Sequence, residues 1–240
     1  MKIFITDYDG TLFINENKIK STVKKLTKLQ NDDFIIVIAT GRSYSSIKNQ
    51  TTIYNIPYDY LICADGSIIY NKKNTIEKMY PMNNEIIKPL EEFYQTLKYE
   101  EIQFSYPEYY SNILNSDNKL LGINICLSTK NYNQEIVDDF FKIANHYPNY
   151  NFLNYTHPNF SYLCVKPKNI SKSFAIKYLI KKHKVLKKDL YVIGDSLNDY
   201  EMIKDYNGVC VRNSYPEILK ISKKIYENIN DYIDDIKKND

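Results

Sequence analysis

Two carboxylates stand one residue apart near the start of the chain, directly after an apolar run. The run is Lys2–Thr6, and Asp7, Tyr8, Asp9, Gly10 and Thr11 follow it. Asp and Gly are ordinary turn residues, so a strand that simply ends in a turn is one explanation. Alternate residues of an extended chain face the same side, however, so Asp7 and Asp9 are also able to point into one pocket.

Two more polar clusters follow apolar runs later in the chain. They are Thr40, Gly41 and Arg42 after residues 34–39, and Asp195, Asn198 and Asp199 after residues 190–193. In an open parallel sheet, ligands bind beyond the carboxyl ends of the strands. We therefore expect the three clusters to converge on one site, which turns alone do not explain.

Several carboxylates in one site require a cation. Two unit charges about 4 Å apart repel by about 4 kcal/mol even at an effective dielectric constant near 20. Mg²⁺ is a hard cation that is held by a few carboxylates together with substrate phosphate. Such a metal offsets the repulsion between an anionic nucleophile and a phosphate. The residue types therefore predict Mg²⁺ as the cofactor and a small-molecule phosphate ester as the substrate.

The elements that must position these clusters alternate between strands and helices. We predict strands at 2–6, 34–39, 60–63, 67–70, 190–193 and 208–211, and helices at 20–30, 44–49, 171–183, 199–204, 216–222 and 231–237. Ser171 is the expected N-cap of its helix. Apolar strands separated by amphipathic helices indicate a parallel sheet that is covered on both faces.

Residues 83–166 differ from the rest of the chain in their charge and in the pattern of their predicted elements. They contain an excess of acidic residues, predicted helices at 84–97 and 135–145, and strand-like stretches at 102–106, 122–128 and 162–165. This pattern predicts a separate α+β module inserted into the α/β domain, with Pro81 and Pro167 near its ends. The aromatic residues Phe104, Tyr106, Tyr109 and Tyr110 are expected mainly to pack within it, and lining a sugar pocket is the alternative.

Composition excludes some classes of function. The net charge of +3 and the lack of a basic run interleaved with aromatic residues give no indication of nucleic-acid binding. No segment has the roughly 18 to 20 apolar residues of a membrane span, and Asp7 and Asp9 interrupt any signal-peptide pattern. The four cysteines are scattered, which favours free thiols in a reducing compartment. We expect a cytoplasmic monomer or weak homodimer that binds no nucleic acid and no membrane.

Taken in order, the motifs resemble those of the haloacid dehalogenase-like (HAD) phosphohydrolases, and most closely their Cof-type sugar-phosphatase branch. The matching segments are Asp7–Thr11 (DxDGT), Thr40–Arg42 (TGR), the helix-opening Lys172 and Gly194–Asp199 (GDxxND). The resemblance covers both parts of the core and is only topological over the insert. It implies an α/β fold with a Rossmann-like parallel-sheet core, formed by residues 1–82 and 167–240, and an inserted α+β cap domain at 83–166. Cap closure would exclude bulk water.

The resemblance also implies a role for each matching residue. Asp7 would be the nucleophile that forms an aspartyl-phosphate, and Asp9 would be the general acid and base. Mg²⁺ would be held by Asp7, the backbone carbonyl of Asp9, and Asp195. The phosphoryl group would be bound by Thr40, Gly41, Lys172 and Asn198. Supporting roles would fall to Gly10, Thr11, Arg42 and Asp199.

One position departs from the pattern of the Cof-type proteins. Asp65 stands after the third predicted strand, where those proteins usually carry Asn. An amide is able to donate a hydrogen bond to substrate, whereas a carboxylate is not unless it is protonated. Asp65 either binds a substrate hydroxyl or simply makes a turn, and we favour the turn.

Other functions remain open at this point. A sugar phosphomutase or phosphotransferase on the same scaffold is the nearest alternative to a phosphatase. A glycosyltransferase also places a DxD after an apolar strand, but it is not expected to combine that motif with TGR and GDxxND. A non-catalytic phospho-acceptor or binding protein would not need Asp9 as a second, acid-base carboxylate.

Overall fold

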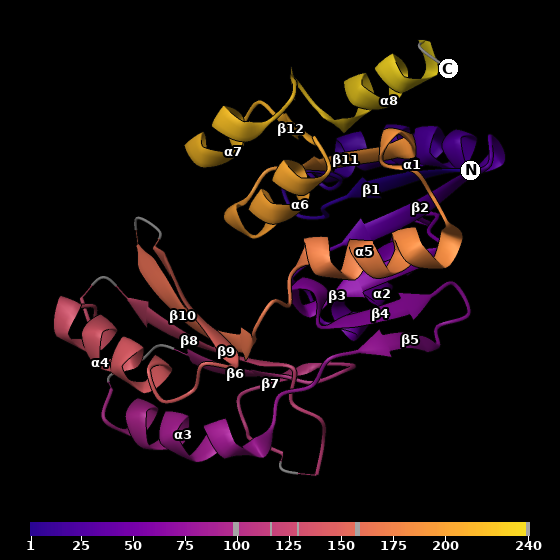
Figure 1. The fold of residues 1–240 in the computed structure, drawn as a ribbon. Coiled ribbons are helices and arrows are strands. Elements are labelled where there is room, and N and C mark those ends of the chain that lie inside the picture. The colour runs from indigo at the N-terminus through magenta and orange to yellow at the C-terminus, as the bar shows by residue number, and fades with distance from the viewer. Residues whose placement is uncertain (98–100, 116, 129, 157–158, 239–240) are drawn as a thin grey trace. The chain divides into compact units, whose positions relative to one another are not determined.

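The structure is a computed structural model that describes residues 1–97, 101–115, 117–128, 130–156 and 159–238. The chain forms two compact units (Figure 1). Unit 1 contains Met1–Lys78 and Ser171–Asp240, and unit 2 contains Met79–Ile170. Each unit has its own hydrophobic core. None of the described helices is long and apolar enough to cross a membrane.

Unit 1 is built on an eight-stranded sheet in the order β13-β12-β11-β1-β2-β3-β4-β5. The strands are β1 (Lys2–Thr6), β2 (Phe34–Ala39), β3 (Tyr60–Cys63), β4 (Ile68–Asn71), β5 (Ile76–Met79), β11 (Leu190–Gly194), β12 (Val209–Val211) and β13 (Ile225–Tyr226). All pairings from β13 to β3 are parallel, and β4 runs antiparallel to β3. The central strand β1 pairs on both sides, with Ile3 opposite Leu190 and Ile35.

Helices cover both faces of this sheet. They are α1 (Glu16–Asn31), α2 (Tyr44–Ile53), α5 (Lys172–His183), α6 (Tyr200–Asp205), α7 (Pro216–Ile221) and α8 (Ile229–Lys238). Successive residues of β1 face opposite sides. Ile3 therefore joins the core that contains Ile176 of α5, while the ring of Phe4 lies 5.9 Å from that of Tyr232 in α8. The near-continuous burial of β1 and β2 follows from this arrangement.

Unit 2 is a five-stranded antiparallel sheet with two helices. Its strands are β6 (Glu101–Ser105), β7 (Tyr110–Ser111), β8 (Gly122–Ser128), β9 (Tyr150–Thr156) and β10 (Phe160–Pro167), in the order β7-β6-β8-β10-β9. Helices α3 (Ile87–Gln95) and α4 (Gln134–Ala144) both lie against one face of it (Figure 1). Phe104 and Tyr106 are fully buried in its core, which confirms that these two aromatic residues pack within the unit.

The predicted fold class is confirmed: a parallel-sheet α/β core with an additional antiparallel sheet. Helix α1 begins at Glu16 rather than at residue 20, because the Asn15 side chain accepts a hydrogen bond from the Lys18 N–H and caps the helix. Strands β5, β7, β9 and β13 were not predicted. Strands β7 and β13 contain only two residues each, and β5 is a partly exposed edge strand without an apolar run.

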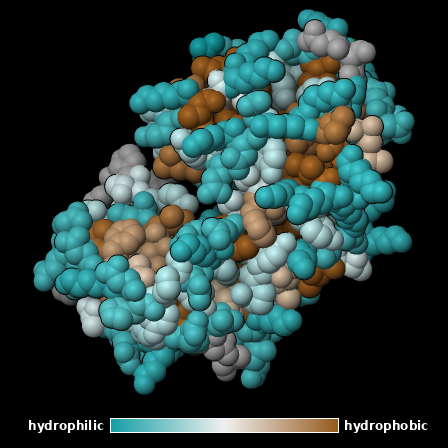
Figure 2. Space-filling view, viewed as in Figure 1, coloured by the Kyte–Doolittle hydropathy of each residue, from teal (hydrophilic) through white to brown (hydrophobic). Residues whose placement is uncertain are grey.

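The visible surface is mostly hydrophilic, with small apolar patches (Figure 2). The four cysteines are free thiols, and Cys63 and Cys210 are buried. This agrees with the sequence-based expectation of free thiols.

Candidate active site

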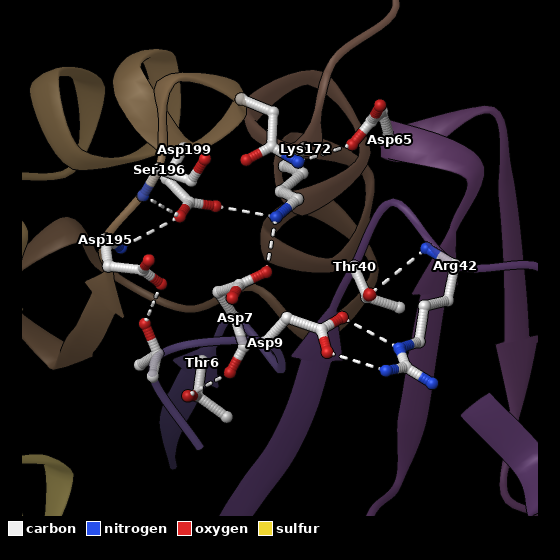
Figure 3. A network of polar contacts seen from close by, with 12 residues as sticks. Thr6, Asp7, Asp9, Thr40, Arg42, Asp65, Lys172, Asp195, Ser196 and Asp199 are labelled. Carbon is white, nitrogen blue, oxygen red and sulfur yellow. Dashed lines mark hydrogen bonds and ion pairs between the residues drawn. The ribbon is translucent and has the colours of Figure 1, made fainter. Parts of the chain in front are cut away.

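The predicted polar clusters meet at the carboxyl edge of the unit 1 sheet (Figure 3). Asp7 directly follows β1, and its N–H donates to the Ile193 carbonyl oxygen at 3.0 Å, which extends the pairing with β11 by one residue. Only 4% of Asp7 is exposed. The parallel register therefore places this carboxylate beside the loop that follows β11, although the two segments are far apart in the sequence.

Lys172 is the buried cation of the site. It is the first residue of α5, and the Ser171 side chain caps that helix, as predicted. Lys172 is 0% exposed, and its Nζ donates to Asp7 Oδ1 and to Asp199 Oδ1, each at 2.6 Å. Burial alone would lower the pKa of Lys172, but the charges of Asp199 and Asp7 outweigh it and raise that pKa. The side chain is thus held as an ammonium group between two carboxylates.

The loop after β11 is fixed by Asp199. Its Oδ2 accepts hydrogen bonds from the N–H groups of Asp195 and Ser196, both at 2.9 Å, so a capping box closes the turn Leu197–Asp199. Asp199 is 0% exposed. This carboxylate therefore holds Lys172 with one oxygen and the loop that carries Asp195 with the other.

The DxDGT turn contacts the same loop. The Thr11 hydroxyl donates to Asp195 Oδ1 at 2.5 Å. Gly10 adopts φ +81°, and a Cβ at this position would lie 2.5 Å from Asp195 Oδ2. Both its positive φ and this close approach require glycine. Gly10 and Thr11 therefore lie against the Asp195 carboxylate.

The acidic cluster fits a hard divalent cation. Asp7, Asp195 and Asp199 each offer a carboxylate oxygen, and these atoms lie within 4.8 Å of one another. Burial raises the pKa of Asp7, and burial together with the Asp199 charge raises the pKa of Asp195 to about 6. Without further positive charge, these carboxyls hold protons more tightly than usual. An oxygen-liganded dication would supply that charge, and oxygen ligands are the ones that Mg²⁺ prefers.

The Asp9 carboxylate is more exposed than that of Asp7 and has a different partner. It is 55% exposed and forms a bidentate ion pair with Arg42, whose Nε and Nη2 each donate a hydrogen bond at 2.7 Å (Figure 3). The Arg42 guanidinium also lies over the Tyr8 ring, 5.0 Å from its centroid, and donates to Ser46 Oγ. The chain turns after Asp7 instead of continuing as a strand, so the alternation of an extended chain does not apply here. Asp9 thus pairs with Arg42, while Asp7 pairs with Lys172.

The ends of β2 and β3 complete the site. Thr40 is 1% exposed, and its hydroxyl oxygen accepts from the Arg42 N–H at 3.1 Å. Asp65 makes the turn that we favoured, with φ 53°, and its Oδ1 also accepts from Asn198 Nδ2 at 2.9 Å. A Cβ at Gly41 would lie 3.1 Å from the same Asp65 oxygen. Asn198 and Gly41 therefore adjoin Asp65.

Two features of the site were not predicted from the sequence. The Ser196 N–H binds Asp199, and the S-x-x-D spacing of a capping box is the signal that would have indicated it. The contact between Asp65 and Asn198 spans 133 residues, and no sequence signal indicates it.

Comparison with known proteins agrees with this geometry. The family model of the haloacid dehalogenase-like hydrolases matches residues 4–112 and 92–234. A protein of Buchnera aphidicola with a provisional phosphatase name is 26% identical over 92% of this chain and 88% of its own length. A similarly named protein of Mycoplasma genitalium is 24% identical over 85% and 84%.

Solved structures of the same fold cover nearly the whole chain. A haloacid dehalogenase-like hydrolase from Bacteroides thetaiotaomicron gives a TM-score of 0.79 at 19% identity, covering 98% of this chain and 99% of its own. A HAD subclass IIB sugar phosphatase gives 0.76 at 17% identity, covering 100% and 98%. The fold and the clustered motifs define a HAD-type hydrolase. The chain belongs to the haloacid dehalogenase-like hydrolase family, so the resemblance stated from its motifs is confirmed.

Proposed function

We propose that this protein is a Mg²⁺-dependent phosphatase of small phosphomonoesters, with sugar phosphates as the expected substrates. The observation that carries the proposal is the buried contact of Asp7 with Lys172, beside the carboxylates of Asp195 and Asp199. A nucleophilic carboxylate, a fixed cation and a set of metal ligands are the parts that attack on a phosphate ester requires. The names of the relatives support the same reaction class.

The first half of the reaction would transfer the phosphoryl group to Asp7. A carboxylate oxygen of Asp7 forms a bond to phosphorus while the bond from phosphorus to the ester oxygen breaks. Asp9 gives its proton to the leaving oxygen, so the product departs as an alcohol. Lys172 and the Thr40 hydroxyl would bind the phosphoryl oxygens, with Gly41 and Asn198 beside them.

The second half would hydrolyse the aspartyl-phosphate. Asp9 takes a proton from a water molecule as the water oxygen forms its bond to phosphorus, and the bond between phosphorus and the Asp7 oxygen breaks. Inorganic phosphate and the starting carboxylate result, and Asp9 is protonated again for the next cycle. Lys172 keeps its charge throughout and stabilises the negative charge on the phosphoryl oxygens.

The metal would be held by Asp7, Asp195 and the backbone carbonyl of Asp9. When bound, Mg²⁺ supplies positive charge that lowers the repulsion between the carboxylate nucleophile and the phosphate dianion. Asp199 would act through Lys172 and the backbone of the loop after β11, which it holds by two hydrogen bonds. The action of unit 2 as a mobile cap stays a prediction.

Phosphate release from a panel of sugar phosphates, nucleotides and cofactor phosphates tests the proposal. The assay is run with Mg²⁺, with chelator, and with Asp7→Asn, whose amide cannot attack phosphorus. We expect turnover that requires Mg²⁺ and falls at least about a thousandfold in the variant. Absence of release from every ester by folded, metal-bound protein would contradict the proposal and favour a phosphomutase or a binding protein.

A further inference from the structure

Asp65 places an additional carboxylate beside the residues proposed to hold the phosphoryl group. Its Oδ1 accepts from Asn198 Nδ2 at 2.9 Å, and a Cβ at Gly41 would lie 3.1 Å from the same atom. Asp65 is also one of the anions that stabilise the charged form of Lys172. Neither the metal set nor the proposed phosphoryl transfer uses this carboxylate.

The backbone holds Asp65 in a defined position. Its φ of 53° and ψ of 32° are left-handed, and its N–H donates to the Thr40 carbonyl oxygen at 3.2 Å. The next residue, Gly66, has φ +103° and leaves no space for a Cβ, which would lie 2.1 Å from the Ser171 carbonyl oxygen. The turn is thus seated against the start of α5, and the Asp65 carboxylate is a fixed part of the site.

Asp65 also fixes the orientation of the Asn198 amide. An ionised carboxylate only accepts hydrogen bonds, so Asn198 must turn its Nδ2 toward it. The Asn198 Oδ1 atom is buried and has no hydrogen-bond partner in the described part of the chain. Because that atom is enclosed, the acceptor that a ligand can reach is the half-buried Asp65 carboxylate, which suits hydroxyl groups and repels anionic groups that can only accept.

The charges of the site lead to the same conclusion. The carboxylates are Asp7, Asp65, Asp195 and Asp199, and Lys172 is the cation that contacts Asp7 and Asp199, while Asp9 and Arg42 offset each other. With one Mg²⁺ bound, these residues would still carry one excess negative charge. A phosphate ester adds negative charge of its own, so any anionic group on its leaving group meets further repulsion.

We propose that Asp65 is a specificity-determining residue: it favours phosphomonoesters whose leaving group is neutral and bears hydroxyl groups over those whose leaving group is itself anionic. This inference rests on the proposed phosphatase function and names the substrate class of the same site.

The variant Asp65→Asn isolates the charge. Asparagine tolerates the left-handed backbone, and its carbonyl oxygen is able to accept from Asn198, so only the negative charge is lost. We compare kcat/KM for glycerol 1-phosphate, which has a neutral leaving group, with that for phosphoglycolate, which has an anionic one. We expect the kcat/KM for phosphoglycolate, divided by that for glycerol 1-phosphate, to rise about tenfold in the variant. This is the order of effect of one nearby charge.

Asp231→Asn is the matched control, because it removes one charge from the exposed face of α8. The ratio of the two kcat/KM values in this control should equal that of the unmodified protein. A ratio in Asp65→Asn within twofold of the unmodified value, or an equal rise in Asp231→Asn, would overturn the inference while leaving the phosphatase function intact. Asp65→Gly, which also suits a left-handed backbone, replaces the asparagine variant if that variant does not fold.

Binding of inorganic phosphate, measured by calorimetry with Mg²⁺ present, gives a readout that does not need turnover. The same charge argument predicts several-fold tighter binding by Asp65→Asn than by the unmodified protein or Asp231→Asn. If the unmodified protein hydrolyses neither of these two esters, this measurement decides the role of Asp65 without turnover, and the wider panel of esters still tests the proposed function. Unchanged phosphate affinity would then overturn the inference.

Discussion

Lys172 sets the charge balance of the site at the scale of single residues. Its ammonium group is fully buried, and each of its two carboxylate partners lies 2.6 Å away. A buried group of paired charges often stabilises a fold no more than apolar residues of similar size would in its place. Removal of a single charged partner, however, leaves the remaining charge buried without compensation. The residue is thus needed for stability as well as for its proposed part in catalysis.

Lys172→Met should therefore lower the free energy of unfolding by about 3–5 kcal/mol, because Asp7 and Asp199 remain without their cation. Urea denaturation in chelator measures the change. Lys182→Met removes a partly exposed lysine that pairs with Glu77, and it should cost less than about 1 kcal/mol. Equal destabilisation by the two variants would contradict the assignment of a buried charge network.

Arg42 is expected to act through Asp9, since both of its donors to that carboxylate lie at 2.7 Å. Arg42→Ala should lower kcat about tenfold or more with a smaller effect on KM, because Asp9, the proposed acid-base residue, loses the partner that orients it. In an Asp9→Asn background the same change should add almost nothing. The control is Arg212→Ala, in which an exposed pair with Glu227 is lost. A full additional loss in the double variant would show a separate role for Arg42.

At the scale of elements, the turn after β3 and the start of α5 position Lys172. Gly66→Ala combines an unfavourable positive φ with a methyl group 2.1 Å from the Ser171 carbonyl oxygen. We expect a loss of stability of about 3 kcal/mol or more, together with a fall in phosphatase activity, because the first turn of α5 must shift. Melting temperature and turnover measure the two effects.

Gly122→Ala is a suitable comparison, because the added methyl group would lie 3.3 Å from the Val165 carbonyl oxygen within unit 2. Its effect should be clearly smaller than that of Gly66→Ala. Similar melting temperatures for the two variants would argue against a tight fit between the turn and α5.

At the scale of the whole molecule, the stability of metal-free protein should depend on pH. The folded-state pKa of Asp195 is raised from 3.8 to about 6, and that of Asp7 is raised as well, in both cases mainly by burial. A raised carboxyl pKa stabilises the folded state below the unfolded pKa, and this contribution is lost as pH rises through the folded pKa. In chelator, the free energy of unfolding should fall between about pH 4 and pH 6, by about 2–3 kcal/mol from Asp195. A rise over this interval would contradict the raised pKa values.

Mg²⁺ should reverse that loss, because a ligand that binds only the folded state stabilises it. Above pH 6 we expect the melting temperature to rise with Mg²⁺ concentration. In Asp195→Asn the rise should be largely abolished, since the amide is a weaker ligand than the carboxylate. Calorimetric scans at several Mg²⁺ concentrations test this point, and a response unchanged in the variant would exclude Asp195 as a ligand.

The sequence by itself determined the core strands and the order of the motifs. Strands β1, β2 and β3 were predicted with their observed bounds, because a parallel strand covered on both faces is a continuous apolar run between polar turns. The convergence of the polar clusters that follow β1, β2 and β11 was predicted from the rule that ligands bind at the carboxyl ends of such strands, whereas Lys172 was assigned from the family resemblance. Both inferences depend on which stretches of the chain are apolar and which are polar, and this pattern is read directly from the sequence.

The tertiary structure decided where individual side chains point. Asp9 pairs with Arg42 and Asp7 pairs with Lys172, because Arg42 follows β2 and Lys172 begins α5. Asp65 contacts Asn198 only because β3 and β11 belong to one sheet and end at the same edge. These contacts depend on the register of strands far apart in the chain, and register is set by the packing of the whole sheet rather than by any local pattern.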